Sequence, residues 1–150
     1  MSGRRLLFVI TVVNFVGHSL TIHCDMATTA LVQQGILGQT PDFNWLGVLR
    51  VHLHEGDDTQ IALTGIVLIK DKYALANADD VARIPKRIFE SDTLAMFIPT
   101  DDTPWFVPPL SYVTHPEYQY STLNSIAIIE LNFSDDQDSP LNPICFPTLA

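Results

Sequence analysis

The sequence is poor in cysteine and in basic residues, and each shortage excludes a class of protein. Two cysteines in 150 residues are too few for a disulfide-rich miniprotein or a four-cysteine zinc site. Eight Lys and Arg against 17 Asp and Glu give a formal net charge of −9. We therefore expect no binding to nucleic acid or to an anionic membrane, since both need clustered cationic side chains. The 47% of hydrophobic residues suffices for the core of one domain and excludes general disorder.

One long apolar run is present, at residues 6–16 behind Arg4 and Arg5. It is shorter than the roughly 20 apolar residues that span a bilayer. Small residues at positions 17 and 19 suit a cleavage site, so the pattern predicts a secretory signal peptide over residues 1–19. The alternative is a buried N-terminal strand or helix. Loss of the two arginines would shift the net charge from −9 to −11, and we expect a secreted, extracellular product.

Short apolar runs follow, broken by turn residues about every ten positions. They lie at residues 45–54, 61–69, 73–76, 93–98, 111–114 and 125–131. This spacing predicts an all-β barrel or sandwich. Ten prolines argue against long helices, and we expect at most one helical turn, within residues 78–87 before Pro85. The run 125–131 is apolar on both faces up to Glu130, which predicts a position deep in the sheet.

The first of these runs alternates, with Trp45, Leu49, Val51 and Leu53 on one face and Arg50, His52 and His54 on the other. Alternate histidines on a strand can bind zinc. The pattern favours a solvated face leading into an acidic turn, because the sequence offers no third ligand that can be located. We predict no metal and no cofactor.

An exported chain would also present the sequon Asn132-Phe133-Ser134, which predicts glycosylation at Asn132. The acidic cluster at 135–138 lacks the ligand spacing of a calcium loop, and we interpret it as a solvated turn.

Four segments resemble, in order, the N-terminal half of a chymotrypsin-like (trypsin-family) serine peptidase. They are NWLGVL (44–49), TGIVLIKDKYALANADDV (64–81), VTHPEY (113–118), and SIAIIEL (125–131) followed by LNPICFP (141–147). The family counterparts of the second and fourth are CGGSLI with VLTAAHCV, and DIALLKL with PICLP. The resemblance covers roughly residues 36–147. It implies a lead segment at 20–35 and, at 36–150, a single six-stranded antiparallel barrel, the N-terminal barrel of the trypsin-like fold.

The resemblance also implies that the catalytic residues are replaced. The family's catalytic histidine falls on Asp79 and its orienting aspartate on Ser125, while the nucleophile belongs to the second barrel. A carboxylate is too weak a base near neutral pH to replace an imidazole, and Ser125 has no charge with which to stabilise an imidazolium. We expect a non-catalytic homologue.

Two disulfide positions follow from the same resemblance. The bridge beside the catalytic histidine would join Thr64 and Asp80, and is absent. Cys145 occupies the PIC motif, whose cysteine bonds the lead segment in secreted zymogens, and this implies a Cys24–Cys145 disulfide. The alternative is two buried free thiols.

These inferences predict a secreted pseudo-peptidase that binds a protein partner, namely a protease, zymogen or inhibitor of an extracellular cascade. A lone barrel leaves an apolar face uncovered, and we expect that face, near Asp79 and Ser125, to bind the partner. The alternatives are a truncated serine endopeptidase whose second barrel is missing here, a metal or small-ligand binder using His52 and His54, and a fragment without a function of its own.

Overall fold

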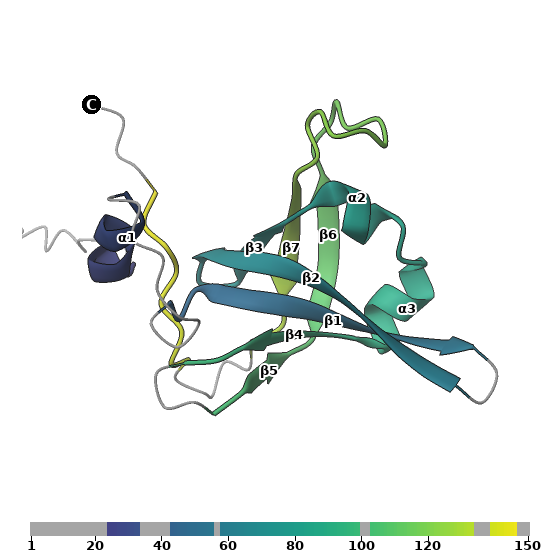
Figure 1. The fold of residues 1–150 in the computed structure, drawn as a ribbon, viewed down its shortest axis with the longest axis horizontal. Coiled ribbons are helices and arrows are strands. Elements are labelled where there is room, and N and C mark those ends of the chain that lie inside the picture. The colour runs from purple at the N-terminus through teal and green to yellow at the C-terminus, as the bar shows by residue number, and fades with distance from the viewer. Residues whose placement is uncertain (1–23, 34–42, 56–57, 100–102, 134–138, 147–150) are drawn as a thin grey trace, which may run out of the picture.

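The structure is a computed structural model and describes residues 24–33, 43–55, 58–99, 103–133 and 139–146. The predicted signal peptide, the cluster at 135–138 and the end of the sequon lie outside these residues. The elements, in chain order, are α1 (Met26–Gln33), β1 (Leu46–Glu55), β2 (Asp58–Lys70), β3 (Tyr73–Ala76), α2 (Ala78–Ala82), α3 (Lys86–Ser91), β4 (Thr93–Phe97), β5 (Trp105–Val107), β6 (Pro109–Thr114) and β7 (Ala127–Leu131). Figure 1 shows their arrangement.

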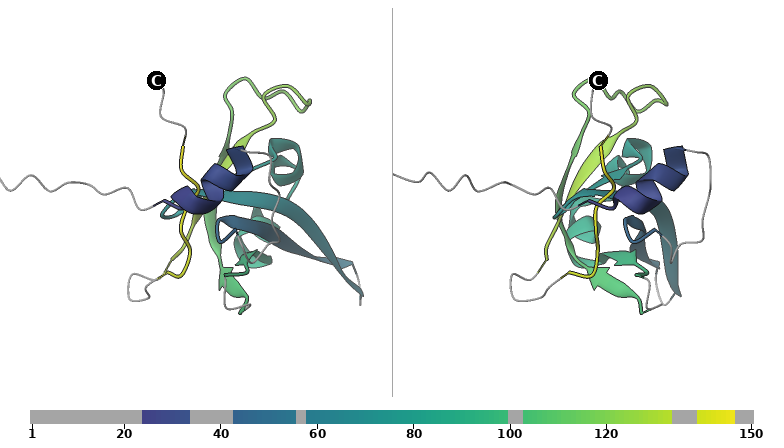
Figure 2. Two further views of the ribbon diagram at one scale, coloured as in Figure 1. Left: turned by 60° about the vertical axis from the view of Figure 1, so that its left-hand side comes forward. Right: turned by 90° about the vertical axis from the view of Figure 1, so that its left-hand side faces the viewer.

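The strands form one curled antiparallel sheet in the order β5-β4-β1-β2-β3-β7-β6 (Figures 1 and 2). The prediction of an all-β fold is confirmed in part, because the chain is mostly β but contains a few helices. The sheet has seven strands where six were expected, because Pro108 separates β5 from β6. Proline has no N–H to donate to a ladder. On its two sides the chain pairs with opposite ends of the strand order, β5 with β4 and β6 with β7.

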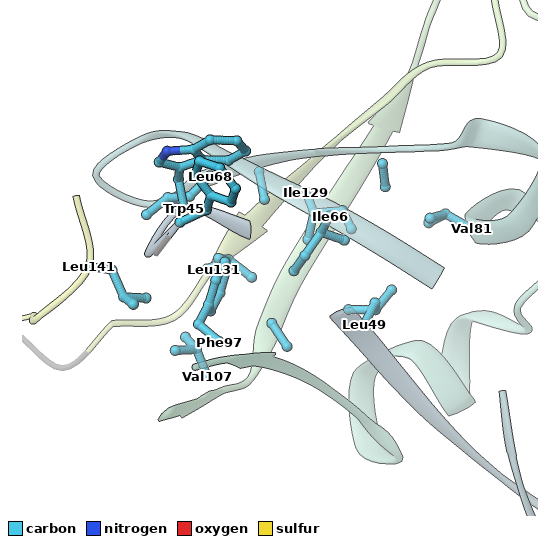
Figure 3. Close-up of a cluster of buried hydrophobic side chains, with 14 of the residues drawn as sticks. Trp45, Leu49, Ile66, Leu68, Val81, Phe97, Val107, Ile129, Leu131 and Leu141 are labelled. Atoms are coloured by element: carbon cyan, nitrogen blue, oxygen red, sulfur yellow. The ribbon is translucent and has the colours of Figure 1, made fainter. Parts of the chain in front are cut away.

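The core lies inside the curl and is built from alternate residues of each strand (Figure 3). Leu49, Ile66, Ile129 and Phe97 are fully buried, as the period-2 pattern requires. Each such side chain contributes about 1.5–3 kcal/mol through burial of apolar surface. The predicted alternation along β1 is confirmed in its first part: Trp45, just before the strand, and Leu49 and Val51 are buried, while Arg50 and His52 are half-buried and His54 is exposed. Leu53, predicted on the inner face, is only half-buried.

Gly47 allows β1 and β4 to pack closely. A Cβ atom at position 47 would lie 2.6 Å from Cδ1 of Phe97 and 2.8 Å from the carbonyl oxygen of Met96. The ring of Phe97 therefore occupies the space that a side chain would need, and glycine is required for the core to close here.

The expectation of a single helical turn is wrong. Besides α2, within the predicted range, the structure contains α3 directly after Pro85 and α1 in the lead segment. Phe89 of α3 is buried, with its ring centroid 4.9 Å from that of Tyr112. Asp25 caps α1 by accepting a 3.1 Å hydrogen bond from the N–H of Thr28. The high proline content argued against these helices, but a capping hydrogen bond stabilises α1 and a buried aromatic contact stabilises α3.

The burial of β7 differs from the expectation. It lies between β3 and β6, but only its inner face is buried. Ile128 is 45% exposed, Ile126 just before the strand is 42% exposed, and Val113, opposite Ile128 on β6, is 70% exposed. The second apolar face of this run is therefore open to solvent.

One end of the β1–β2 pair extends beyond the rest of the sheet (Figure 1). The two strands pair from Leu46↔Val67 to Glu55↔Asp58. β4 pairs with β1 only at 47–51, and β3 pairs with β2 only at 66–70. Residues 52–55 and 58–61 thus form a two-stranded projection, the β1–β2 arm, and β3 leaves the edge of β2 uncovered as far as Gly65.

Candidate functional site

The two positions that the resemblance assigns to the catalytic histidine and aspartate lie together in space. Asn77 ends the turn after β3 and caps α2 by accepting a 2.9 Å hydrogen bond from the N–H of Asp79. The same N–H lies 3.2 Å from Oγ of Ser125, which precedes β7. The Ser125 hydroxyl in turn donates a 2.6 Å hydrogen bond to Oδ1 of Asn77. A backbone bond of 3.3 Å from Ala78 N–H to the Ser125 carbonyl fixes the two segments side by side.

The carboxylate of Asp79 is held by two donors. The guanidinium of Arg83, one turn later on the chain, lies 3.0 Å from Oδ1 and 2.9 Å from Oδ2. The hydroxyl of Tyr118 donates a 2.8 Å hydrogen bond to Oδ1. The hydrogen bond from Arg83, followed by that from Tyr118, lowers the pKa of Asp79 below its ordinary value of 3.8. The group is therefore an anion at neutral pH and serves as an acceptor.

The pKa of Tyr118 is shifted upwards, whereas that of Asp79 is lowered. Desolvation first, and the hydrogen bond to Asp79 second, raise the pKa of Tyr118 from 10.0 to about 12. Its phenol stays protonated through the physiological range. The ring also lies against Tyr120, with centroids 5.3 Å apart. Tyr120 and Asn124, in the segment between β6 and β7, adopt positive φ angles of 54° and 56°.

A polar groove of about 520 Å³ opens over this cluster. It is lined by Asn77, Asp79, Arg83, Tyr120, Ser121, Thr122 and Ser125. The groove contains hydrogen-bonding groups and one ion pair, but no imidazole. Its chemistry suits polar recognition of a ligand surface.

The two positions of the absent family disulfide are also in contact. The Thr64 hydroxyl donates a 2.7 Å hydrogen bond to Oδ2 of Asp80. The bond joins β2 to α2, which are the elements that a disulfide at these positions would link.

The Cys24–Cys145 disulfide predicted from the resemblance is present (Figure 2 shows α1 beside the C-terminal segment). It joins residues 121 positions apart, with a Cα–Cα distance of 5.1 Å. Hydrogen bonds reinforce it: Asp25 N–H donates to the Pro143 carbonyl at 2.8 Å, and Cys145 N–H donates to Oγ1 of Thr29 at 3.1 Å. The described part of the chain contains no free cysteine.

The histidines have local structural partners. Nδ1 of His52 lies 3.3 Å from the Asp92 carbonyl, and Nε2 of His54 lies 3.7 Å from Oδ1 of Asp92. Nδ1 of His115 accepts a 3.2 Å hydrogen bond from Glu117 N–H. Across the described ranges, no three His, Cys, Asp or Glu side chains gather in a way that could hold a metal ion. Asn132 of the sequon is exposed.

Three members of the cluster were not predicted from the sequence: Asn77, Arg83 and Tyr118. Asn77 carries a helix-cap signal, and Arg83 stands four residues after Asp79, so local rules identify both. Tyr118 lies 39 residues from Asp79, and no local pattern indicates that contact.

The fold indicates a structural class. A mostly β, curled antiparallel sheet with few helices is consistent with one barrel of the trypsin-like fold. Among solved structures, that of GrC (granzyme C) has a TM-score of 0.51 at 16% identity, covering 74% of this chain and 47% of that one. Neuropsin, a serine protease expressed in the limbic system of mouse brain, gives 0.48 at 16% identity over 75% and 47%. The likeness to the GrC structure shows a shared fold. The chain spans about half the length of both proteins.

No family model and no curated protein matches the sequence. In the described part of the chain, no helix is long and apolar enough to cross a membrane.

Proposed function

We propose that this chain is a secreted, non-catalytic serine-protease homologue that acts by binding another protein of an extracellular proteolytic cascade. The partner class is a protease, a zymogen or an inhibitor. Export rests on the predicted signal peptide at 1–19 and is supported by the Cys24–Cys145 disulfide, which suits an oxidising compartment.

The cluster around Asp79 supports the absence of catalysis. A general base must accept a proton near neutral pH, whereas Arg83 and Tyr118 stabilise the anionic form of Asp79. The Ser125 hydroxyl is already engaged with Asn77 and has no charge to offer an imidazolium. The replaced positions therefore form a closed hydrogen-bonded cluster with a structural role.

The observation that carries the binding proposal is an apolar patch beside this cluster, which we name the β6–β7 patch: Val113, Ile126 and Ile128. Val113 and Ile128 are directly opposed across the two strands, at 70% and 45% exposure. Ile126 directly follows Ser125 in the chain and is 42% exposed. Neighbouring exposed apolar side chains of this kind mark interaction surfaces. Ser125 lines the polar groove over Asp79 and directly precedes Ile126 in the chain, so the groove offers hydrogen-bonding groups at this end of the patch.

Site-specific photocrosslinking tests the binding proposal. A benzophenone amino acid at position 128 of the secreted protein, exposed to its native extracellular fluid, should form an adduct with a trypsin-family protease, its zymogen or an inhibitor. The same probe at Ile61, on the β1–β2 arm and 50% exposed, is the matched control and should not capture that partner. The double substitution V113D/I128D should weaken binding of the purified partner by about tenfold or more, since charges would replace a desolvated apolar contact. Equal capture from both positions would contradict the proposal.

A second candidate is a trypsin-like serine endopeptidase whose second barrel lies outside this sequence. The chain's 47% coverage of the GrC structure favours it. Peptidase assays on this chain and on the longest product of its gene distinguish the two. We expect no turnover of peptide substrates and no labelling by a fluorophosphonate. Turnover abolished by a serine-directed inhibitor would establish the endopeptidase instead.

A further inference from the structure

The β1–β2 arm has an open backbone edge on β2. His52 N–H donates to the Asp92 carbonyl on the β4 side, and Leu68 N–H donates to the Trp45 carbonyl on the β1 side. Hydrogen-bonding direction alternates along a strand. Even-numbered residues of β2 therefore bond to β1, and Thr59, Ile61 and Leu63 direct their N–H and C=O groups away from it. Among the described residues, β3 is the other strand paired with β2, and its pairing stops at Ile66.

The side chains along this edge do not protect it. Ile61 is 50% exposed and Leu63 is 64% exposed, and both lie on the outer face of the sheet. Residues 59–65 contain no charged residue and no proline. Natural edge strands are usually blunted by lysine, proline or a bulge, because an unblunted edge is a template for another strand.

A groove lies beside the same edge. Its volume is about 290 Å³, and it is lined by Val51, Leu53, Ala62, Leu63, Thr64, Asp80, Arg83, Ile84 and Pro85. A strand added to the β2 edge would direct alternate side chains over this groove, as in other cases of strand addition.

We propose that the occupant of this edge is the β2 strand of a second copy of the chain, paired antiparallel about a two-fold axis. This proposal is independent of the β6–β7 patch and of the proposed function. An edge with uncharged, outward-facing groups at Thr59, Ile61 and Leu63 is self-complementary under a two-fold rotation. Two copies of a chain with a net charge of −9 repel each other. The repulsion is weakest where neither surface carries charge, so the uncharged segment 59–65 is where two copies can come into contact.

The alternation of backbone hydrogen-bonding direction along β2 restricts the register in which the two copies can pair. An outward-facing residue can pair only with another outward-facing residue, so Ile61 must face an odd-numbered position. If Ile61 pairs with Leu63 of the second copy, the two-fold axis also pairs Leu63 with Ile61 of that copy. The interface then contains two contacts between exposed apolar side chains. The axis then passes between the two Ala62 residues, which form a pair without hydrogen bonds. One strand from each copy buries less than a standard interface, so the dimer is weak and concentration-dependent.

Engineered cysteines test this register directly, because both native cysteines are bonded to each other. In a pair without hydrogen bonds the Cα atoms are about 4.5 Å apart, within disulfide range. The full chain carrying A62C should therefore form a covalent dimer under mild oxidation. The matched control Q60C should stay monomeric, because the two Gln60 residues lie about 14 Å apart along the strands. Equal crosslinking of the two variants would overturn the proposal.

Sedimentation velocity over a range of concentrations tests the interface without added cysteine. The unmodified chain should show a monomer–dimer equilibrium, and I61K should weaken it about tenfold, with an unchanged circular dichroism spectrum. I128D should leave the equilibrium unchanged. A chain that is monomeric at every concentration, or a dimer broken by I128D and not by I61K, would overturn the proposal. Pairing of the edge with a different protein, without self-association, would equally do so.

Discussion

The hydroxyl of Thr64 and the carboxylate of Asp80 form a 2.7 Å hydrogen bond between β2 and α2. These are the positions at which the serine-peptidase resemblance places a disulfide. A polar contact therefore links the two elements where the family uses a covalent bond.

This relationship predicts that the double variant T64C/D80C forms a disulfide. The two side chains already meet, and closing a loop between residues 16 positions apart stabilises by about 3 kcal/mol in the chain-entropy treatment. Intact mass and thiol titration report bond formation, and urea unfolding reports the gain relative to the reduced form. Either single variant is the control and should gain nothing. Two free thiols in the oxidised, folded double variant would contradict the alignment of these positions.

The Asp79–Tyr118 contact predicts that the phenol of Tyr118 ionises at an unusually high pH. The pKa of Tyr118 is raised to about 12, first by desolvation and second by Asp79, so its hydroxyl should ionise well after an ordinary tyrosine. Since the folded pKa lies above the unfolded value of 10.0, the contribution to stability is full below pH 10 and is lost as pH rises towards 12. Ultraviolet absorbance at alkaline pH measures it, with Y118F as reference. D79N should lower this pKa only in part, because desolvation remains.

The lowered pKa of Asp79 predicts a change in stability at acidic pH. Its pKa in the folded state lies below 3.8, so its contribution to stability is present above that value and is lost as pH falls through the folded pKa. Acid unfolding of the D79N variant should therefore differ from that of the unmodified chain mainly above pH 3.8, and the two curves should converge below it. A constant difference at all pH values would contradict the ion pair with Arg83 as its source.

The contact between Gly47 and Phe97 predicts a sharp difference between two glycines of the sheet. G47A should destabilise by about 1–3 kcal/mol, because its Cβ would overlap the Phe97 ring and the Met96 carbonyl. G65A is the matched control: its Cβ would meet nothing within 4 Å, and alanine lowers the entropy of the unfolded chain. Denaturant unfolding of both variants measures the difference. Equal stabilities would show that the core relaxes around position 47.

Removing the Cys24–Cys145 bridge should destabilise the protein by about 2–5 kcal/mol, because the loop that it closes spans nearly the whole described chain. The double variant C24S/C145S avoids an unpaired thiol, and urea unfolding under non-reducing conditions gives the loss. Reductant should lower the stability of the unmodified chain and leave that of the variant unchanged.

The strands were predictable from the sequence because inward and outward residues alternate, and the run at 73–76 coincides with β3. β5 was missed, since three residues next to two prolines carry too little pattern. The outward face of β7 was misjudged because periodicity reports hydrophobicity and cannot report whether a neighbour covers Ile128.

Part of the candidate site could also be predicted from the sequence. The resemblance brought Asp79 and Ser125 into one interpretation, and the structure places them in contact. Tyr118 lies in the turn that follows β6, where its N–H donates to the His115 carbonyl, and its hydroxyl reaches Asp79 from there. The same segment between β6 and β7 contains positive φ angles at Tyr120 and Asn124. Single-sequence propensities do not specify such a turn.

The bond between Cys24 and Cys145 has a consequence for processing of the polypeptide. One peptide-bond cleavage anywhere between these residues would produce two fragments that stay covalently attached. Such a nicked molecule would migrate as a single species until a reductant separates its pieces, so a maturation cut could reshape a surface without releasing either fragment.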